Sequence, residues 1–319
     1  MKTGWERRMP YIGVDPPLLA DLLAPAFPGG PIESCELVTE GLVNSNYRVV
    51  VGGKTVLLRL YARDPAACGK EASLARRFGS VLPIPAVLHA DSSCERLPHP
   101  YAVHEWVDGV RADDVVIAGE VAPVAEACGR LLARLQGIEF AAPGFLAEDL
   151  SPVDPVPLTP AFYSGWMREW VLTTSAADVL GDGLAERVIA WADARAPLVG
   201  AVGAERHLVH SDFNGANILM RRGPGGWEVA ALLDWEFAFA GTSLFDVANM
   251  LRHYTLSGPD FAEPFLGAFA AAGGRLPGQW LDTARALDMM SLIGFLARPD
   301  CGATTQRDVL ALICGYLAA

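Results

Sequence analysis

The sequence predicts an α+β protein of two lobes, a small antiparallel sheet with one helix followed by a larger, mainly helical part. The first hundred residues contain short β-rich runs separated by turn signals. From Asp113 onward, apolar residues recur with the period of a helix instead. No internal repeat or low-complexity linker separates the two parts. We therefore expect lobes at 1–106 and 107–319, joined by a short strand-to-helix connection near 106–111.

The first lobe is expected to begin with a β-hairpin. Residues 42–51 and 55–61 are β-rich runs joined by Gly52-Gly53, a pair that favours a tight antiparallel turn. Asp64-Pro65 then provides an N-cap and a first-turn proline for a helix over 65–78. Two further strands are predicted at 86–90 and 101–106.

Helical periodicity dominates the second lobe, with one exception. Around the turn Gly223-Pro224-Gly225-Gly226, two short apolar runs predict a second hairpin over 217–235. The expected helices lie at 117–136, 160–179, 183–195, 244–255, 259–271, 279–297 and 305–318.

The composition indicates a globular protein rather than a disordered one. Of the 319 residues, 51% are hydrophobic and 19% are charged, which leaves enough apolar side chains for two cores. The formal net charge of −12 disfavours nucleic acid and anionic membrane surfaces as partners, because both repel a negative surface. An acidic pocket for a cationic substrate and simple solubility both explain such a charge.

The six cysteines are isolated from one another along the chain. Their spacing fits neither a zinc site nor a disulfide framework. The sequence also shows no export signal at its start and no apolar stretch long enough to span a bilayer. Isolated thiols in such a chain indicate a cytoplasmic protein.

The strongest motif is an H-x-D-x-x-x-x-N string formed by His210, Asp212 and Asn217, followed by Asp234 at the end of an apolar run. These groups suit phosphoryl transfer, because its loose transition state needs positioning and charge neutralisation rather than covalent chemistry. Asp212 would orient an acceptor hydroxyl and take its proton, while His210 would hold the loop through hydrogen bonds. Asn217 and Asp234 offer the amide and carboxylate oxygens that Mg2+ prefers.

The residues around this motif resemble the aminoglycoside phosphotransferase and choline kinase superfamily, which is distantly related to the protein kinases. The resemblance rests on 210–220 with 232–236, and on 240–246, where Asp246 matches an aspartate that steadies the site in that family. It extends into the first lobe, where 40–49 (EGLVNSNYRV) resembles a strand–turn–strand that covers the nucleotide. The resemblance implies a bilobal, protein-kinase-like fold with a nucleotide-binding first lobe and a catalytic, substrate-binding second lobe.

The same resemblance implies further roles in the first lobe. Arg59 would bind the phosphates of ATP or GTP, and Glu71 would pair with it. The backbone at Glu105 and Val107 would bind the purine through hydrogen bonds. Ser45 and its neighbours would close over the phosphates with backbone amides.

The sequence departs from the family pattern at several places, including Gln136, where relatives often have histidine. Arg59 replaces a lysine, which exchanges a point charge for a bidentate contact. The turn over 42–46 has only Gly41 beside it, which weakens the case for a phosphate cradle. Ser211 replaces a common glycine, a change that we expect to be sterically easy. An ordinary strand arginine and an exposed helix glutamate are the alternatives for Arg59 and Glu71.

The insertion between Gly144 and Leu208 is where this superfamily builds its substrate pocket. Within it, Trp166 and Trp170 lie at helical spacing and form either an aromatic wall for the acceptor or a buried face against the C-terminal helices. Glu236, two residues after the metal aspartate, is the acidic side chain nearest the chemistry for an acceptor that carries an amine.

Together these observations predict a monomeric or homodimeric small-molecule kinase. It would transfer the γ-phosphoryl group of ATP or GTP to a hydroxyl of an aminoglycoside-like antibiotic, as in antibiotic resistance, or of a similar small, cationic metabolite. A choline-, ethanolamine- or homoserine-type metabolite kinase is the alternative.

Readings of other classes are weaker. A non-catalytic nucleotide-binding module on a decayed kinase fold is disfavoured by the complete set of polar groups. A P-loop is excluded because position 48 is arginine where that motif requires glycine. A eukaryotic-type protein kinase would need a glycine-rich loop and an Ala-Pro-Glu segment, and the chain has neither.

Overall fold

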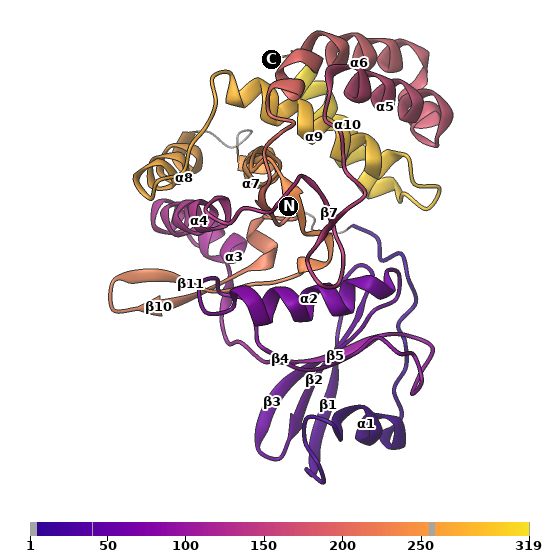
Figure 1. The fold of residues 1–319 in the computed structure, drawn as a ribbon, viewed down its shortest axis with the longest axis vertical. Coiled ribbons are helices and arrows are strands. Elements are labelled where there is room, and N and C mark those ends of the chain that lie inside the picture. The colour runs from indigo at the N-terminus through magenta and orange to yellow at the C-terminus, as the bar shows by residue number, and fades with distance from the viewer. Residues whose placement is uncertain (1–4, 40, 255–258, 319) are drawn as a thin grey trace.

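The computed structural model describes residues 5–39, 41–254 and 259–318, and it consists of two lobes (Figure 1). Strands dominate the lower lobe in Figure 1, and most of the helices form the upper lobe. This arrangement confirms the α+β, bilobal fold that the sequence predicts. Among the described residues, no helix has the length and apolar character needed to cross a membrane.

A five-stranded antiparallel sheet forms the centre of the small lobe. Its strands are β1 (Ile32–Val38), β2 (Ser45–Val51), β3 (Lys54–Leu60), β4 (Val87–Asp91) and β5 (Tyr101–Glu105), in the spatial order β1-β2-β3-β5-β4. Every second side chain of β2 is buried, as expected for a strand with one face on a core. Gly52 and Gly53 have φ values of 56° and 73° and form the predicted tight turn between β2 and β3.

Two helices accompany this sheet. Helix α2 (Pro65–Phe78) begins as predicted, with Asp64 accepting a hydrogen bond from a backbone N–H of the first turn. Helix α1 (Pro16–Leu23) starts in the same way after Asp15. Helix α1 and strand β1 go beyond the elements predicted from the sequence, and the leucines of α1 pack into the core of the sheet.

The helical lobe contains most of the remaining chain. Its helices are α3 (Ala112–Ile117), α4 (Val121–Gln136), α5 (Pro160–Thr173), α6 (Ala176–Ala201), α7 (Leu244–Tyr254), α8 (Pro259–Ala271), α9 (Trp280–Leu296) and α10 (Ala303–Ala318).

Glycines and a capping residue shift some helix boundaries from the predicted positions. The helix predicted over 117–136 begins at Val121 as α4, and Gly119, with φ of 97°, separates it from the additional short helix α3. The chain leaves the helical conformation at Thr174, earlier than predicted, which ends α5. Gly181, with φ of 66°, only kinks α6. The predicted helix over 183–195 is therefore part of a longer one.

Short strands anchor the loops that carry the H-x-D-x-x-x-x-N motif of the helical lobe. They are β6 (Val110–Arg111), β7 (Gly144–Leu146), β8 (Pro152–Val153), β9 (His207–Val209), β10 (Ile218–Gly223), β11 (Gly226–Leu232) and β12 (Phe239–Gly241). The predicted hairpin is present as β10 and β11. Strand β6 pairs with β10, and β9 pairs with β12, so the chain before and after each loop is anchored.

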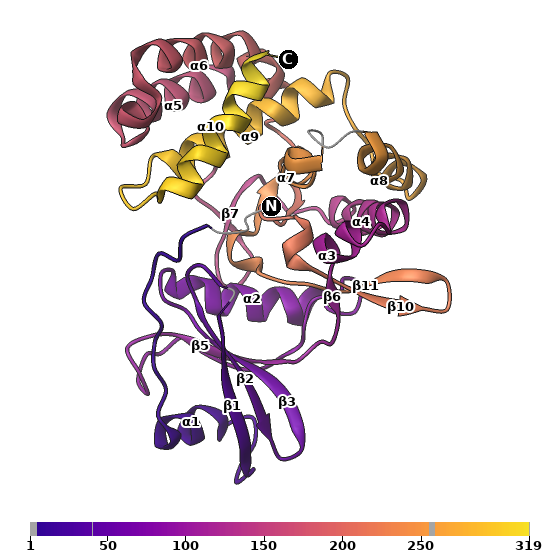
Figure 2. The ribbon, with the colours of Figure 1, turned by 180° about the vertical axis from the view of Figure 1, so that it is seen from behind.

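The first described residues lie on the helical lobe, although they precede the small lobe in sequence. Figure 2 shows this segment running from the helical lobe along one edge of the molecule to α1. The Trp5 ring lies 5.0 Å from the Phe295 ring on α9, between centroids. Glu6 accepts a hydrogen bond of 2.9 Å from the backbone N–H of Thr304 at the start of α10. The lobe boundary predicted at 106 stays a prediction, since β5 ends at Glu105 and the chain reaches β6 only at Val110.

Candidate active site

The loop that follows β9 is fixed by a buried carboxylate. Asp246, in the first turn of α7, accepts hydrogen bonds of 2.8 Å from the backbone N–H groups of both His210 and Ser211. The Nδ1 atom of His210 accepts a hydrogen bond of 3.2 Å from the backbone N–H of Asp212, so Nε2 carries the proton that it donates to the Leu233 carbonyl at 2.9 Å. His210 is fully buried and links the loop to the end of β11.

Asp212 is held in one orientation by two amide side chains. Its Oδ1 accepts a hydrogen bond of 2.9 Å from Asn214, and its Oδ2 accepts one of 2.8 Å from Asn217. Asn217 uses its Nδ2 for this contact, and no described residue donates a hydrogen bond to its Oδ1. One polar oxygen of Asn217 is therefore available to a cation or a ligand.

Asp234 follows β11 and reaches across the interface to the small lobe. Its Oδ1 accepts a hydrogen bond from Nη2 of Arg59 on β3. The other end of the same guanidinium donates to both carboxylate oxygens of Glu71 on α2, at 3.2 and 3.3 Å. Burial by itself would lower the pKa of Arg59, but the charges of Glu71 and Asp234 hold that pKa well above its ordinary value. Glu71 is buried and paired, so the exposed-glutamate alternative does not hold.

The side chains of the motif converge on one cavity between the lobes. Asp212, Asn217 and Asp234 all line this cavity, which has a volume of about 430 Å³, and Arg59 forms part of its wall. Gly41, Leu42, Val43 and Asn44, which precede β2, line it from the small lobe. The cavity therefore joins a carboxylate, an amide, a second carboxylate and a guanidinium.

The donor set of this cavity fits Mg2+ better than a transition metal. Among the described residues, no three His, Cys, Asp or Glu side chains gather closely enough to hold a metal alone. Mg2+ is commonly bound by one or two carboxylates, with phosphates and water completing its shell. Asp234 and Asn217 offer hard oxygen atoms of this kind at the cavity wall.

Three of the predicted nucleotide contacts lie outside this cavity. Ser45 is fully buried at the start of β2, where its hydroxyl accepts a hydrogen bond of 2.9 Å from the N–H of Ile12. Its neighbours Asn44 and Asn46 line the cavity. Ser45 does not, because it is paired with β3 and its side chain is buried within the small lobe. Glu105 ends β5, and Val107 lies in the link that follows, so both sit at the junction of the lobes.

The predicted acceptor contacts are divided in the same way. Glu236 lines the cavity and accepts a hydrogen bond of 3.2 Å from Asn44. Burial and the charge of Asp234 raise its pKa to about 7. Trp166 and Trp170 stack on each other on α5, with ring centroids 4.3 Å apart, and both pack against the helical core. Neither lines the cavity, which matches the buried-face interpretation rather than the aromatic wall.

Arg7 is a residue of the site that the sequence analysis missed. Its guanidinium donates hydrogen bonds to the carbonyls of Gly41, Val43 and Asn44, the latter two at 2.9 and 3.1 Å. It thereby clamps the turn over the cavity, although that turn lacks a run of glycines. The only sequence signal is the pair Arg7-Arg8, and their partners lie too far along the chain for a local pattern to reveal.

Ser211 corrects the expectation that serine is an easy replacement for glycine. Its φ is 69°, in the left-handed region where a β-carbon is strained. The Asp246 contact to its N–H and a hydrogen bond of 3.1 Å from Asn249 to its carbonyl hold this conformation. The turn therefore stores strain beside Asp212.

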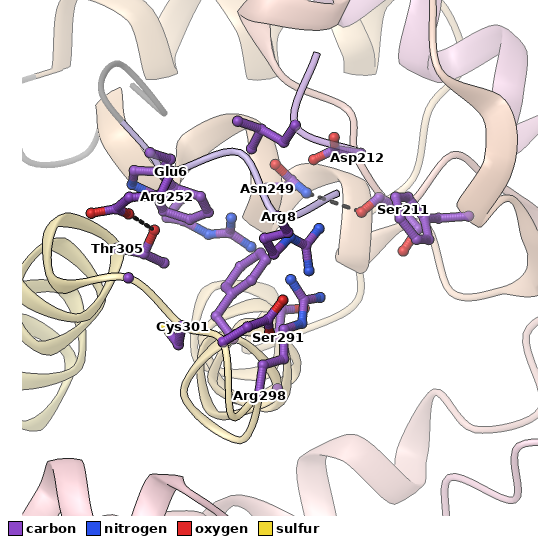
Figure 3. A pocket seen from close by; sticks show the side chains of 17 residues that line it. Glu6, Arg8, Ser211, Asp212, Asn249, Arg252, Ser291, Arg298, Cys301 and Thr305 are labelled. Carbon is purple, nitrogen blue, oxygen red and sulfur yellow. Dashed lines mark hydrogen bonds between the residues drawn. The ribbon is translucent and has the colours of Figure 1, made fainter. Parts of the chain in front are cut away.

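A second, smaller cavity adjoins the other side of Asp212 (Figure 3). It has a volume of about 220 Å³ and lies between the loop after β9, helix α9 and the N-terminal segment. Asp212, Trp5 and Arg8 line both cavities, so the two spaces meet at the loop. The smaller cavity is further lined by Ser211, Asn249, Arg252, Phe295, Arg298 and Thr305.

Comparison with known proteins finds one family and a consistent fold. The sequence model of the phosphotransferase enzyme family matches residues 34–285. The hygromycin-B 4-O-kinase of Escherichia coli is 29% identical over an alignment of 233 residues, which covers 67% of this chain and 60% of that enzyme. The chain thus spans less than two thirds of the length of that relative.

Solved structures share the fold at low sequence identity. The aminoglycoside phosphotransferase APH(4)-Ia has a TM-score of 0.68 at 19% identity, over 94% of this chain and 99% of that one. The macrolide 2'-phosphotransferase MphH from Brachybacterium faecium has a TM-score of 0.59 at 21% identity, over 92% and 97% of the two chains. These matches support the protein-kinase-like fold.

Replacing Ser211 by glycine should stabilise the protein. Glycine adopts the left-handed conformation without a clash of its β-carbon, so we expect Ser211→Gly to raise the free energy of unfolding by about 1 kcal/mol. Urea denaturation of the two proteins measures this difference. Ser211→Ala keeps the strain and should bring no such gain. Equal stability of Ser211→Gly and the parent protein would contradict the strain.

The buried Asp246 carboxyl should make stability depend on pH. Burial raises its pKa to about 7, from 3.8 for an exposed side chain. The folded protein then retains a proton that the unfolded chain has already lost, so the free energy of unfolding falls as pH rises from about 4 to 7. Asp246→Asn removes this titration and should flatten the slope, by at most about 1.4 kcal/mol per pH unit. Denaturation curves at several pH values test this, and an unchanged slope would refute it.

Proposed function

Because the chain belongs to the phosphotransferase enzyme family, we propose that it transfers the γ-phosphoryl group of ATP to a hydroxyl group of a small molecule. The observation that carries the proposal is the convergence of Asp212, Asn217 and Asp234 on one cavity whose wall includes Arg59. A reaction with a loose transition state needs such an arrangement of oriented polar groups.

Asp212 is the group that would handle the acceptor. The acceptor oxygen forms a bond to the γ-phosphorus while the bond between that phosphorus and its bridging oxygen to the β-phosphate breaks. The hydroxyl proton passes to the Asp212 carboxylate, and the nucleoside diphosphate leaves. The hydrogen bonds from Asn214 and Asn217 hold the carboxylate in place without bulk water having to reorganise around it.

Asn217 and Asp234 would hold Mg2+ through their side-chain oxygens. When bound, Mg2+ neutralises phosphate charge. Arg59 donates a hydrogen bond to Asp234, and Glu71 positions its guanidinium to contact a phosphate at the same place. Arg7 keeps the turn before β2 folded over that position.

The acceptor could belong to more than one chemical class. The names of related enzymes support an aminoglycoside-like antibiotic, as in hygromycin-B 4-O-kinase, or a macrolide. The sequence also predicted a small cationic metabolite, with choline, ethanolamine and homoserine as alternatives. ATP is supported over GTP by the APH(4)-Ia complex, which contains an ATP analogue and hygromycin B.

Removing the proposed base should separate binding from catalysis. Asp212→Asn keeps the hydrogen-bonding shape but cannot accept the proton, so we expect turnover to fall roughly 100-fold or more. Mg-ATP binding, measured by calorimetry, should be retained. The measurement is acceptor-dependent ADP release in a coupled assay. Unchanged turnover would remove Asp212 from this role.

Removing the Arg7 clamp should weaken nucleotide binding. Arg7→Leu leaves the carbonyls of the turn without their donor, so we expect the KM for ATP to rise about tenfold with a smaller effect on kcat. Arg96→Leu removes an exposed arginine from the same lobe and serves as the matched control. Equal KM values for the two variants would show that the clamp does not position the turn.

A further inference from the structure

The smaller cavity is lined by Asp212 but not by Asn217 or Asp234, which line only the larger one. If Asp212 takes a proton from the acceptor, as proposed above, the acceptor can occupy this cavity while the phosphates occupy the larger one. The inference below therefore rests on the proposed function and concerns the chemistry of the acceptor.

Two arginines of this cavity have no ion-pair partner among the described residues. Arg8, from the N-terminal segment, and Arg298, just after α9, are both half-buried, and neither has a carboxylate of the described part of the chain within 4.0 Å. Their guanidinium groups point into the same part of the cavity (Figure 3). The guanidinium carbon of Arg298 lies 4.8 Å from the centroid of the Phe295 ring, in a cation–π contact. Half-buried cations without counter-charges are unfavourable until an anion binds.

The third arginine of the cavity provides the contrast. Arg252 is fully engaged with Asp288, with contacts of 3.0 and 3.1 Å from its Nε, and Asp288 also accepts a hydrogen bond of 2.8 Å from Tyr316. This buried pair is neutral and belongs to the packing of α7 against α9 and α10. The available positive charge of the cavity is therefore that of Arg8 and Arg298.

The acidic side chains of the cavity do not cancel this charge. Glu6 is engaged with the start of α10, through the N–H of Thr304 and the hydroxyl of Thr305 at 2.9 and 3.1 Å. Asp300 lies exposed at the rim, where water screens it. Asp212 is tied to Asn214 and Asn217 and is reserved for the acceptor hydroxyl.

The electrostatics of the arginines agree with this geometry. Burial and the nearby charges of Arg8 and Arg63 together lower the pKa of Arg298 to about 10, against a smaller opposing effect of Asp300. Burial and the charge of Arg63 lower the pKa of Arg8 as well. The cations thus repel one another, which an anionic group between them would relieve.

We infer that the acceptor carries an anionic group, a carboxylate or a phosphate, which binds between Arg8 and Arg298 while its hydroxyl meets Asp212. The remaining wall is apolar, formed by Trp5, Leu42, Phe237 and Phe295, and covers the carbon skeleton. An anionic acceptor differs from the cationic acceptor that the sequence predicted. The prediction relied on the net negative charge of the whole protein, whereas the available charge in this cavity is the positive charge of Arg8 and Arg298.

The test compares compounds of one size that differ in charge. Gluconate and glucose 6-phosphate are the carboxylate and phosphate probes, glucitol is neutral, and glucosamine is cationic. Hygromycin B and kanamycin represent the large cationic acceptors. Binding to the full-length protein saturated with a non-hydrolysable Mg-ATP analogue is measured by calorimetry, and ADP release with Mg-ATP is measured for the same compounds.

We expect gluconate or glucose 6-phosphate to bind at least tenfold more tightly than glucitol and glucosamine. Arg298→Leu and Arg8→Leu should each weaken anion binding about tenfold to a hundredfold and leave glucitol binding unchanged. Arg298→Lys keeps the charge and should lose less, which separates recognition from folding defects. Arg130→Leu removes an exposed arginine on α4 and is the matched control.

The outcomes are distinct for the two proposals. Tighter binding of glucosamine, hygromycin B or kanamycin than of both anions, or anion binding that the Arg8 and Arg298 variants do not change, overturns the anionic acceptor. Absence of measurable anion binding does the same. Failure of the parent protein to bind the Mg-ATP analogue, or to transfer phosphate to any compound of any charge, counts against the kinase itself.

Discussion

The buried guanidinium of Arg59 is the interaction on which the rest of the site depends. Through Glu71 it joins β3 to the following helix α2, and through Asp234 it joins both to the end of β11, which is distant in sequence. An arginine with this little exposure cannot remain without counter-charges, so the two carboxylates are held close to it, and with them the two lobes. The Tyr61 hydroxyl donates to Glu71 at 2.6 Å and completes the network from below. The need to neutralise the buried charge of Arg59 thus fixes how the two lobes are aligned on either side of the cavity.

In the helical lobe, the loop after β9 and the turn after β11 are strained and are held by several contacts. Ser211 and Asp234 both have left-handed backbone conformations, with φ of 69° and 70°, on either side of Asp212 and Asn217. Such conformations persist only where the surroundings determine them. Here the surroundings are Asp246 below the loop and the His210 ring, which packs against Trp235 with centroids 4.7 Å apart. These contacts offset the cost of the strain.

The sequence allowed the fold class and the catalytic string to be predicted because both depend on local patterns. The α2 start follows from Asp64-Pro65, and the first hairpin follows from Gly52-Gly53, all of which act through their nearest neighbours. The features that the sequence analysis did not predict depend on contacts between distant residues or on backbone angles. The contacts of Trp5 and Glu6 with α9 and α10 join the two ends of the chain, and no local period reveals them. Serine at position 211 was expected to be sterically easy, because its strain is visible only in the backbone angle φ of the folded structure.

The N-terminal segment shows why overall charge is a poor guide to a binding site. The protein carries a net charge of −12, yet the segment brings Arg7 to the turn over the larger cavity and Arg8 to the boundary between the two cavities, where it lines both. Trp5 anchors this segment to α9 at one end, and the N–H of Arg8 bonds the Leu42 carbonyl at 3.0 Å at the other. The charge of a cavity therefore depends on the side chains that line it, and this segment adds arginines that the net charge of the protein does not predict. Acidic side chains that lie farther away act on the cavities only through screened distances.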